Sequence, residues 1–430
     1  MAKTYYTYKD SGIAWIGNIP SEWKIVRIKD EYSFQTGATP PTGNESYFDG
    51  DNIWVSIADM KEKVIIDSKK KVSNSGIDIC NMSIAPKGSL LYSFKLSVGN
   101  VAFAGKDLYT NEAIASFSPN AGYLPFLYYT APQFVVYNSN TNIYGANILN
   151  QELIKNALVP FPPLSEQQAI ATYLDEKCGE IDSLISLQEE MISELQAYKQ
   201  SVITEAVTKG LDPNVPMKDS GVEWIGMIPE GWNICKLKFL CSSIKDGSHF
   251  SPTTTEEGFP YITAADVHGK GLDYANAKKI SEKDYNDLVQ SGCKAEKDDI
   301  LLVKDGATTG RVGMKIENNP CVLLSSVAML RVNTKAYPTY LMYMVSSDLL
   351  QQQISIAMAG SAMPRITLTK LNTFIALEVP LSEQQAIASY LDEKTSQIDS
   401  LIAIKQEKIT ELKDYKKSII YEYVTGKKKV

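Results

Sequence analysis

The sequence predicts an α+β protein in which two mixed α/β domains are joined and spaced by two long helices that pair as an antiparallel coiled coil, giving a pseudo-twofold internal repeat. Three observations predict this fold. Two segments of the chain each occur twice, heptads of apolar residues follow one of them, and strand and helix patterns recur in one order between them. Repetition on this scale defines an architecture before any single motif does.

The two repeats divide the chain. Residues 164–185 (LSEQQAIATYLDEKCGEIDSLI) return as residues 381–402 (LSEQQAIASYLDEKTSQIDSLI), with 18 of 22 positions identical. Residues 9–23 (KDSGIAWIGNIPSEW) return as residues 218–232 (KDSGVEWIGMIPEGW), with 10 of 15 identical. We therefore expect a first domain (1–160), a first long helix (161–210), a second domain (211–378) and a second long helix (379–430).

Both domains read as mixed strand and helix. Apolar runs bounded by glycine and asparagine predict strands at residues 53–58, 89–94 and 101–105, and at residues 259–266, 299–304 and 310–316. Helices are expected at residues 123–138 and 337–354, in matching places. The repeated tryptophans Trp15, Trp23, Trp224 and Trp232 are expected to be packing anchors.

Each long helix carries its own start signal and an apolar stripe. Prolines precede Ser165, and Gln168 completes a Ser-x-x-Gln capping box that predicts the first start. The stripe follows heptad spacing, with a second track interleaved. Its predicted helix-pair and partner-docking residues are Leu174, Ile181, Leu184 and Leu195, and Leu391, Ile398, Leu401 and Leu412.

Two packings would bury these stripes: each helix on its own domain, or the two helices on each other. Heptads sustained past four repeats favour a helical partner, so we expect an antiparallel pair. The stripe is wider than a two-helix seam needs, which predicts that a further protein docks there.

Composition limits the class of protein. A chain of 430 residues is too long for one core. Six cysteines without a Cys-x-x-Cys pair, and no apolar run of 18 residues, lead us to expect a cytoplasmic protein without a membrane span. The net charge of −7 argues against a generally basic nucleic-acid binder, but residues 161–210 alone carry 3 basic and 9 acidic residues. Most of the excess acid therefore lies on one helix.

Polar loops between the predicted strands supply the candidate contacts. They combine Gln, Asn, Ser, Thr and Tyr with single Lys or Arg residues, which suits hydrogen bonding to base edges. Ordinary turns favour the same residues, so each loop alone is as well explained by a turn. The candidate DNA-binding residues are Gln35, Thr36, Lys95, Asn142, Tyr144, Ser248, Lys304, Thr309, Arg311 and Arg365.

Catalytic motifs are missing from the sequence. The histidines are His249 and His268, and neither belongs to an HExxH motif. Phosphate-binding and zinc-binding spacings are likewise absent, so we expect no catalytic residue and no metal ligand in this chain.

The order of motifs resembles a known family. KDSGxxWIGxIPxxW, a block with TGATP, the PPLSEQQAIAxYLDEK helix, and then a second round with GSAMPRIT and VPLSEQ resemble the specificity subunit of type I restriction–modification systems. The resemblance covers essentially the whole chain. It implies a restriction-system protein in which each domain is a target-recognition domain that binds one half of a split site in double-stranded DNA.

The resemblance also implies partners and their cofactors. The helix pair would space the two domains and bind two methyltransferase (modification) subunits, which carry S-adenosylmethionine and methylate adenine. It allows for translocase/endonuclease (restriction) subunits that use ATP with Mg²⁺. This chain itself would hold no cofactor. Different loops in the two domains predict an asymmetric site, and an antiparallel helix pair would match the dyads of duplex DNA.

Two other classes stay open on the residues alone. One is a stand-alone DNA methyltransferase or nuclease with unrecognised motifs, which would bind S-adenosylmethionine or modify DNA unaided. The other is a coiled-coil scaffold without DNA readout, which would be excluded if exchanging the first variable domain changed sequence choice.

Overall fold

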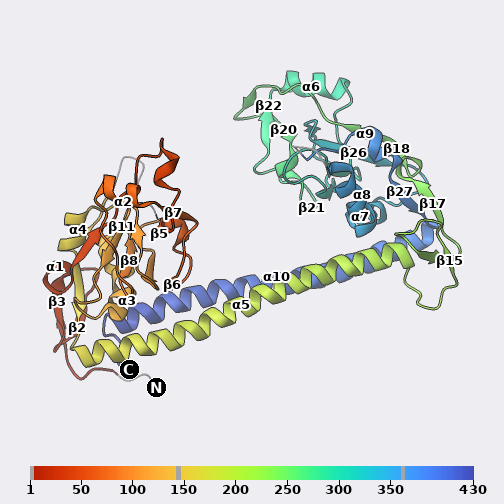
Figure 1. Ribbon diagram of the computed structural model, residues 1–430. Coiled ribbons are helices and arrows are strands. Elements are labelled where there is room, and N and C mark those ends of the chain that lie inside the picture. The colour runs from red at the N-terminus through yellow and green to blue at the C-terminus, as the bar shows by residue number, and fades with distance from the viewer. Residues whose placement is uncertain (1–3, 96, 142–146, 360–363) are drawn as a thin grey trace. The chain divides into compact units, whose positions relative to one another are not determined.

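The computed structural model describes residues 4–95, 97–141, 147–359 and 364–430, and its chain forms two compact units (Figure 1). The first unit comprises Met1–Gln188 with Lys408–Val430, and the second comprises Glu189–Glu407. Two long helices, α5 (Leu164–Lys209) and α10 (Leu381–Val424), each contribute one part to each unit. Each unit is thus one mixed α/β domain on a segment of both helices, as predicted.

A five-stranded sheet forms the centre of the first unit, in the order β4-β11-β8-β9-β6, beside a three-stranded sheet β10-β5-β7. The strands are β1 Tyr8–Asp10, β2 Asn18–Pro20, β3 Lys24–Arg27, β4 Phe34–Thr36, β5 Asn52–Val55, β6 Val64–Ile65, β7 Lys70–Val72, β8 Leu90–Ser93, β9 Val101–Ala104, β10 Tyr109–Thr110, β11 Ile114–Phe117, β12 Asn140–Thr141, β13 Asn147–Ile148 and β14 Leu158–Phe161. The helices are α1 Ile28–Glu31, α2 Asn74–Cys80, α3 Leu124–Phe134 and α4 Gln151–Asn156.

The second unit repeats this sheet in the order β18-β26-β23-β24-β21, beside a four-stranded sheet β19-β22-β20-β25. The strands are β15 Met217–Asp219, β16 Met227–Pro229, β17 Asn233–Lys236, β18 Cys241–Asp246, β19 Thr254–Thr255, β20 Phe259–Ile262, β21 Gly269–Lys270, β22 Lys278–Ile280, β23 Ile300–Val303, β24 Val312–Met314, β25 Val322–Leu323, β26 Val327–Val332 and β27 Ile375–Glu378. The helices are α6 Glu282–Gln290, α7 Pro338–Ser346, α8 Asp348–Met358 and α9 Leu368–Thr373.

The two five-stranded sheets match strand by strand. In each, three antiparallel pairings are followed by one parallel edge strand, β6 or β21. The central strands β8 and β23 are buried along their whole length, which explains why their sequences are mainly apolar and do not alternate with exposed polar residues. The predicted helix at residues 337–354 is two helices, because Ser347 between α7 and α8 adopts an extended conformation.

The long helices start two residues earlier than the capping box predicts, at Leu164 and Leu381. The backbone N–H of Gln167 donates to Pro163 O (3.0 Å), so Ser165 lies inside the first turn and is not the N-cap. Glu166 instead accepts from Trp23 Nε1 at 2.9 Å. The second copy repeats this contact, with Trp232 Nε1 donating to Glu383 at 2.8 Å. The repeated tryptophan therefore fixes the base of each domain to a helix start.

Burial separates the four repeated tryptophans. Trp23 and Trp232 are fully buried, which confirms them as packing anchors. Trp15 and Trp224 are 42% and 46% exposed, and that prediction is wrong for both. They lie on the turns that join β1 to β2 and β15 to β16, at the edge of each domain. Trp15 covers part of its ring by stacking on Tyr137, with ring centroids 5.4 Å apart.

The helices run antiparallel within each unit. In the first unit Lys416 Nζ lies 2.7 Å from Asp182 Oδ1. In the second, Lys199 Nζ lies 2.6 Å from Asp399 Oδ2. In both pairs the later part of one helix faces the earlier part of the other, as only an antiparallel arrangement allows. The preference for helices packed on each other is confirmed, and the domains contact them as well.

Burial corrects one of the two predicted seam tracks. Leu174, Ile181, Leu391 and Ile398 are at most 5% exposed, as predicted. Leu184 and Leu401 are 47% and 48% exposed and lie outside the seam. The second track instead consists of residues that lie four positions after a first-track residue, such as Ile185 and Ile409, which are buried. A 4-3 alternation from Leu174 therefore describes the seam.

Within the described ranges, no helix combines the length and the apolar character that crossing a bilayer requires.

Candidate nucleic-acid interface

The candidate residues of the second unit meet where two strands end. Strands β18 and β23 flank β26 and are both antiparallel to it, so they run in the same direction. Their carboxyl ends therefore lie at one end of the sheet. A Lys-Asp-Gly tripeptide occurs at each of these ends, as residues 245–247 and 304–306.

Five ionisable side chains form a continuous chain there. Lys304 Nζ lies 3.3 Å from Asp246 Oδ2 and 2.9 Å from Asp305 Oδ2. His249 Nε2 lies 3.2 Å from Asp246 Oδ2, and Arg365 Nε lies 3.2 Å from Asp305 Oδ1. We refer to His249–Asp246–Lys304–Asp305–Arg365 as the charge chain.

The centre and the ends of the charge chain differ in exposure. Lys304 is 2% exposed, and a buried ammonium is stable only when anions accompany it. In this conformation Lys304 holds two loops together and does not reach the surface. The side chains of His249 and Arg365 are 67% and 59% exposed. Both are held in place by a carboxylate, and both can meet a base edge, Arg365 as a donor and the neutral ring of His249 as an acceptor through Nδ1.

The segment that carries Arg365 is fixed to the same loop by its backbone. Gly306 N donates to Pro364 O at 3.0 Å, and Ile366 N donates to Lys304 O at 2.8 Å. Thr309 Oγ1 donates to Gly306 O at 2.6 Å, so this candidate stabilises the loop from within. Arg311 lies half-buried where the loop returns to the sheet.

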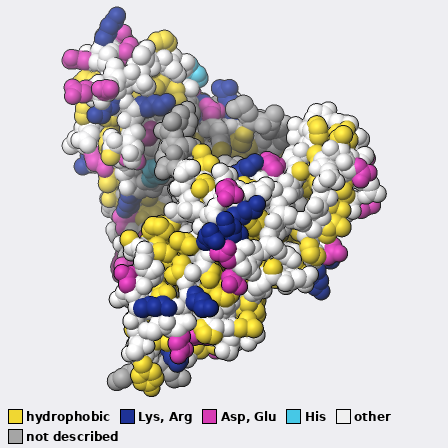
Figure 2. All heavy atoms as spheres, turned by 90° about the vertical axis from the view of Figure 1, so that its left-hand side faces the viewer, with side chains coloured by type: hydrophobic (Ala, Val, Ile, Leu, Met, Phe, Trp, Pro, Cys, Tyr) yellow, Lys and Arg dark blue, Asp and Glu magenta, His cyan; other side chains and the backbone are white. Residues whose placement is uncertain are grey.

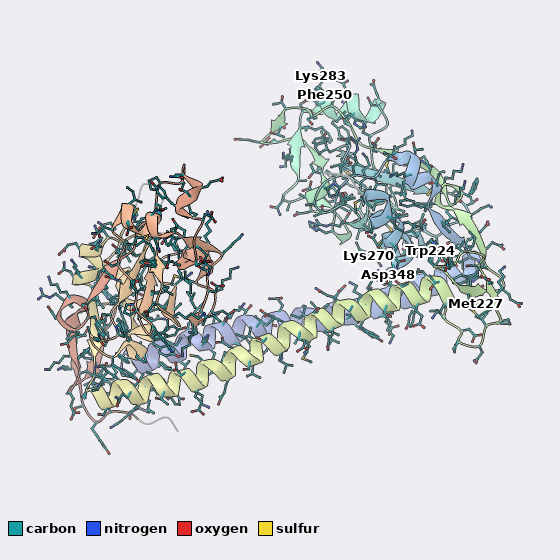
Figure 3. The ribbon with its side chains drawn as sticks, in the orientation of Figure 1. Trp224, Met227, Phe250, Lys270, Lys283 and Asp348 are labelled. Carbon is teal, nitrogen blue, oxygen red and sulfur yellow. The ribbon has the colours of Figure 1, made fainter. Side chains whose placement is uncertain are left out.

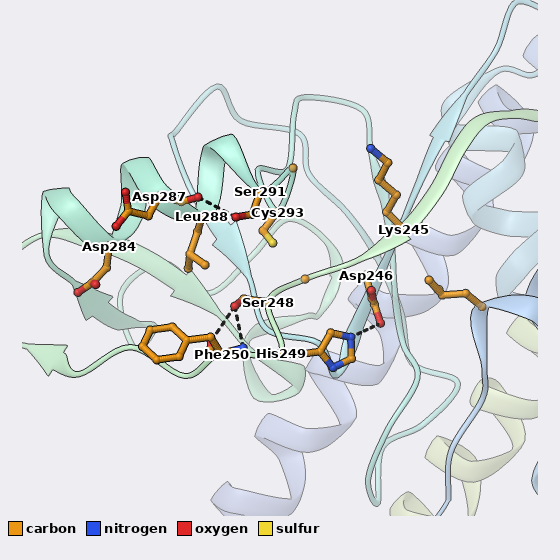
Figure 4. Close-up of a pocket in the computed structure, with 13 residues that line it drawn as sticks. Lys245, Asp246, Ser248, His249, Phe250, Asp284, Asp287, Leu288, Ser291 and Cys293 are labelled. Carbon is orange, nitrogen blue, oxygen red and sulfur yellow. Dashed lines mark hydrogen bonds and ion pairs between the residues drawn. The ribbon is translucent and has the colours of Figure 1, made fainter.

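Ser248 also has a structural place. Its side chain is 6% exposed, donates to Phe250 O at 2.7 Å and accepts from Phe250 N at 3.0 Å (Figure 4). This turn leaves Phe250 66% exposed beside a pocket of about 570 Å³, which Asp284 and Cys293 also line. Figure 3 places Phe250 at the end of the second unit far from its helices.

A glycine allows each of these loops to approach the sheet. A Cβ on Gly247 would lie 2.1 Å from Leu323 O, and a Cβ on Gly37 in the first unit would lie 1.7 Å from Thr110 O. Both distances are shorter than a non-bonded contact allows, so only glycine fits. Gly37 and Gly247 follow the equivalent strands β4 and β18, which shows that the two units share one loop framework.

The first unit presents different chemistry on that framework. Gln35 Nε2 donates to Ile84 O at 2.6 Å, and Thr36 Oγ1 accepts from Gln151 Nε2 at 2.9 Å. Lys95, which follows β8, is exposed. A hydrogen bond from Thr39 holds the pKa of the neighbouring Glu112 below its usual value, and Lys95 adds to that effect.

Equivalent positions therefore differ in charge between the units. Thr36 in the first unit corresponds to Asp246 in the second, because they end the equivalent strands β4 and β18, and Phe94 corresponds to Lys304, because they follow the equivalent strands β8 and β23. The structure thus brings Gln35, Thr36 and Lys95 to one end of the first sheet. Asn142 and Tyr144 lie outside the described residues.

Sequence reasoning missed the acidic residues of the charge chain. Asp246 and Asp305 were not chosen because the search was for donors to base edges, and a carboxylate accepts. The signal was present: two Lys-Asp-Gly tripeptides each follow an apolar strand. On the face shown in Figure 2, Lys and Arg side chains are interspersed with Asp and Glu, as the negative net charge leads one to expect.

Each unit also exposes an apolar group on its helices. In the first unit this group is Leu184, Leu187 and Tyr415, and in the second it is Leu401, Ile404 and Tyr198. All six side chains are at least 47% exposed. The two groups occupy equivalent positions of the helix repeat. Leu195 and Leu412 continue the first seam track and are half-buried.

Comparison with known proteins agrees with this architecture. A family model described as the type I restriction modification DNA specificity domain matches residues 20–197 and again residues 229–414. The chain is 26% identical over 422 residues to the type I restriction enzyme MjaVIII specificity subunit of Methanocaldococcus jannaschii, covering 96% of this chain and 94% of that protein.

Two further matches are more distant. The chain is 26% identical over 286 residues to the type I restriction enzyme EcoBI specificity subunit of Escherichia coli, covering 64% of this chain and 60% of that one. A solved chain from work on complex assembly and conformational transition of the type I R-M system is similar in fold, with a TM-score of 0.68 at 18% identity, covering 94% of this chain and 98% of its own.

Proposed function

Because the chain belongs to the family of type I restriction–modification DNA specificity subunits, we propose that each of its units reads one half of a split, asymmetric DNA site. One observation carries this proposal. Two copies of the same sheet and loop framework end in different side chains, with Thr36 and Lys95 in one and the charge chain in the other. A shared framework with different surface chemistry is what reading two different sequences requires.

In the second unit the reading groups are the exposed ends of the charge chain. Arg365 has a fixed Nε and two terminal amino groups, so it can donate two hydrogen bonds to guanine O6 and N7. With Nε2 directed at Asp246, the neutral ring of His249 can accept a hydrogen bond from a base amino group through Nδ1. Lys304 sets the position of both, because each contacts a carboxylate that the buried ammonium holds.

In the first unit the reading groups are neutral amides and hydroxyls with one lysine. Gln35 and Thr36 each form one hydrogen bond within the unit. An amide or a hydroxyl can form more than one hydrogen bond, so both side chains can still bind a base edge. This set favours adenine or a mixed contact over the guanine that an arginine selects. The two half-sites are accordingly expected to differ in sequence.

The exposed apolar groups on the helices are the proposed docking sites for two methyltransferase subunits. Each unit has one such group in an equivalent position, which matches two copies of one partner. Those partners would bind S-adenosylmethionine and methylate adenine. Restriction subunits that use ATP with Mg²⁺ would join the same complex. This chain would supply sequence choice and no catalysis.

A mapping experiment tests the reading of half-sites. N6-methyladenine is mapped across the genome of cells with this chain, without it, and with Arg365→Ala. With the unaltered chain we expect methylation at one bipartite site, and without the chain we expect none. With Arg365→Ala, one position in one half-site should accept any base. Arg27→Ala removes an exposed arginine paired with Asp30 and serves as the control. An unchanged site in the Arg365→Ala strain would contradict the assignment.

A binding experiment tests the docking sites. Leu184→Glu places a charge in the apolar group of the first unit and should weaken binding of one methyltransferase subunit. Ser186→Glu adds the same charge to an exposed position two residues further along the same helix and should leave binding unchanged. If the purified chain methylates DNA unaided, the stand-alone enzyme is the correct reading.

A further inference from the structure

One helix aspartate in each unit binds the same two groups, a lysine ammonium and a tyrosine hydroxyl. In the first unit Lys63 Nζ lies 2.6 Å from Asp175 Oδ1, and Tyr129 OH donates to the same carboxylate oxygen. Lys63 precedes β6, the edge strand of the five-stranded sheet, and Tyr129 belongs to α3. A strand, a domain helix and the long helix α5 therefore meet at one carboxylate.

The second unit repeats the arrangement. Lys270 forms an ion pair with Asp392 Oδ1, and Tyr343 OH donates to the same oxygen at 2.7 Å. Lys270 lies in the equivalent edge strand β21, and Tyr343 lies in α7. Figure 3 shows Lys270 on the side of the domain that faces the helices. We call each set of Lys, Tyr and Asp a clamp.

Each clamp is a contact between a domain and its helix away from the helix start. At the helix start, Trp23 donates to Glu166 and Trp232 donates to Glu383. In both units the clamp aspartate follows that glutamate by nine residues, which is about 13.5 Å along a helix. The domain and the helices of the second unit also share a buried apolar core, and the clamp adds a polar contact at the edge strand of the sheet.

A pocket interrupts this packing at the clamp of the second unit. It has a volume of about 1090 Å³ and is lined by Lys270, Tyr343 and Asp392, together with Lys199 and Asp399 of the helices. The clamp joins the edge strand to the helix beside this pocket.

The clamps contribute little to folding stability. Lys63 and Asp175 are each 44% exposed, and ion pairs with that exposure stabilise proteins only weakly. Burial and the hydrogen bond to Asp175 raise the pKa of Tyr129, so its hydroxyl stays protonated and donates at neutral pH. The domains differ in most of their sequence and yet both retain the clamp, so its role is better explained by geometry than by stability.

We propose that Asp175 and Asp392 are positioning residues that set the angle of each recognition domain on its helix and so restrict the spacing between the two half-sites. This inference rests on the proposed function. Neighbouring base pairs along DNA are about 3.4 Å apart, so a small rotation at the helix is enough to move the distant loops to another spacing. Neither aspartate touches DNA in this account.

The test uses Asp175→Asn and Asp392→Asn, which keep the shape and remove the charge. Glu180→Gln is the matched control, because Glu180 lies on the same helix and pairs with Lys177 of that helix alone. The assembled methyltransferase complex is given DNA in which the spacer varies by one or two base pairs. We expect preference for the native spacer to fall about fivefold in the clamp variants and to stay unchanged in the control.

A second measurement needs no DNA and no partner. Hydrogen exchange of the full chain should show faster exchange at β6 in Asp175→Asn and at β21 in Asp392→Asn. Unchanged exchange, or faster exchange with the native spacer preference intact, overturns the inference. So does an equal loss of methylation at every spacer. If the unaltered complex methylates no DNA, the proposed function fails, and the exchange data alone decide whether the clamp holds the domain.

Discussion

Replacing Lys304 by methionine should destabilise the second unit by about 3 kcal/mol, because removing one partner of a buried ion pair costs roughly 3–5 kcal/mol. The ammonium is 2% exposed and lies 2.9 Å and 3.3 Å from two carboxylates. Asp246 and Asp305 are 18% and 26% exposed, so water would relieve part of their repulsion, and the lower end of that range is expected.

The assay is hydrogen exchange of the slowest amides in each sheet. Strands β23 and β26 report on the second unit, and strands β8 and β11 provide a reference in the first. Lys335→Met is the control, since its ammonium is 59% exposed and its pair with Glu378 should contribute little to stability. The first sheet should exchange at its normal rate in both variants.

Neutralising the carboxylates as well separates charge from packing. In Lys304→Met with Asp246→Asn and Asp305→Asn, no unpaired buried charge remains, since Arg365 is 59% exposed to water, so most of the lost stability should return. The reasoning is refuted if Lys304→Met is as stable as Lys335→Met. It is also refuted if the triple variant stays as unstable as the single one, since the cause would then be shape and not charge.

The remaining predictions concern the loop, the seam and pH. Gly37→Ala should abolish choice at the first half-site alone, because its Cβ would lie 1.7 Å from a carbonyl oxygen, whereas Gly43→Ala, with open space around it, should leave the methylated site unchanged. In urea unfolding, Leu391→Ala should cost about 2–5 kcal/mol and Leu401→Ala under about 1 kcal/mol; equal costs would argue against the corrected seam. Burial raises the pKa of Tyr128 to about 12, above the value of about 10 in the unfolded chain, so its contribution to stability is complete below pH 10 and is lost between pH 10 and 12. In Tyr128→Phe the free energy of unfolding should fall less between pH 10 and 12 than in the unaltered chain. An unchanged pH dependence would count against this role of Tyr128.

The fold was largely predictable because it depends on patterns that sequence displays directly. The helix repeat and the apolar strands at residues 89–94 and 299–304 were confirmed as α5, α10, β8 and β23. The seam was half right: heptad spacing identified Leu174 and Leu391, but a stripe wider than two tracks does not show which tracks face the partner. Leu184 and Leu401 were placed in the seam for that reason.

The candidate site was harder to predict because its contacts join distant loops. Lys304 was predicted to bind DNA, yet its ammonium lies between two carboxylates, Asp246, which is 58 residues earlier, and Asp305, which is the next residue. That contact depends on strands β18 and β23 ending at the same end of a sheet, which a single sequence does not state. Arg365 and Lys95 remain exposed, as a reading role requires, and their contacts with bases stay predictions.

Mapping methylated adenines after a change in one unit tests the central claim most directly, namely that the two units read separate half-sites. The strains carry the unaltered chain, Gly37→Ala in the first unit, or Arg365→Ala in the second. We predict one bipartite site, with choice lost in one half for the first variant and in the other half for the second. If both variants alter the same half, or if the methylated site is one uninterrupted sequence, the two-reader account is wrong.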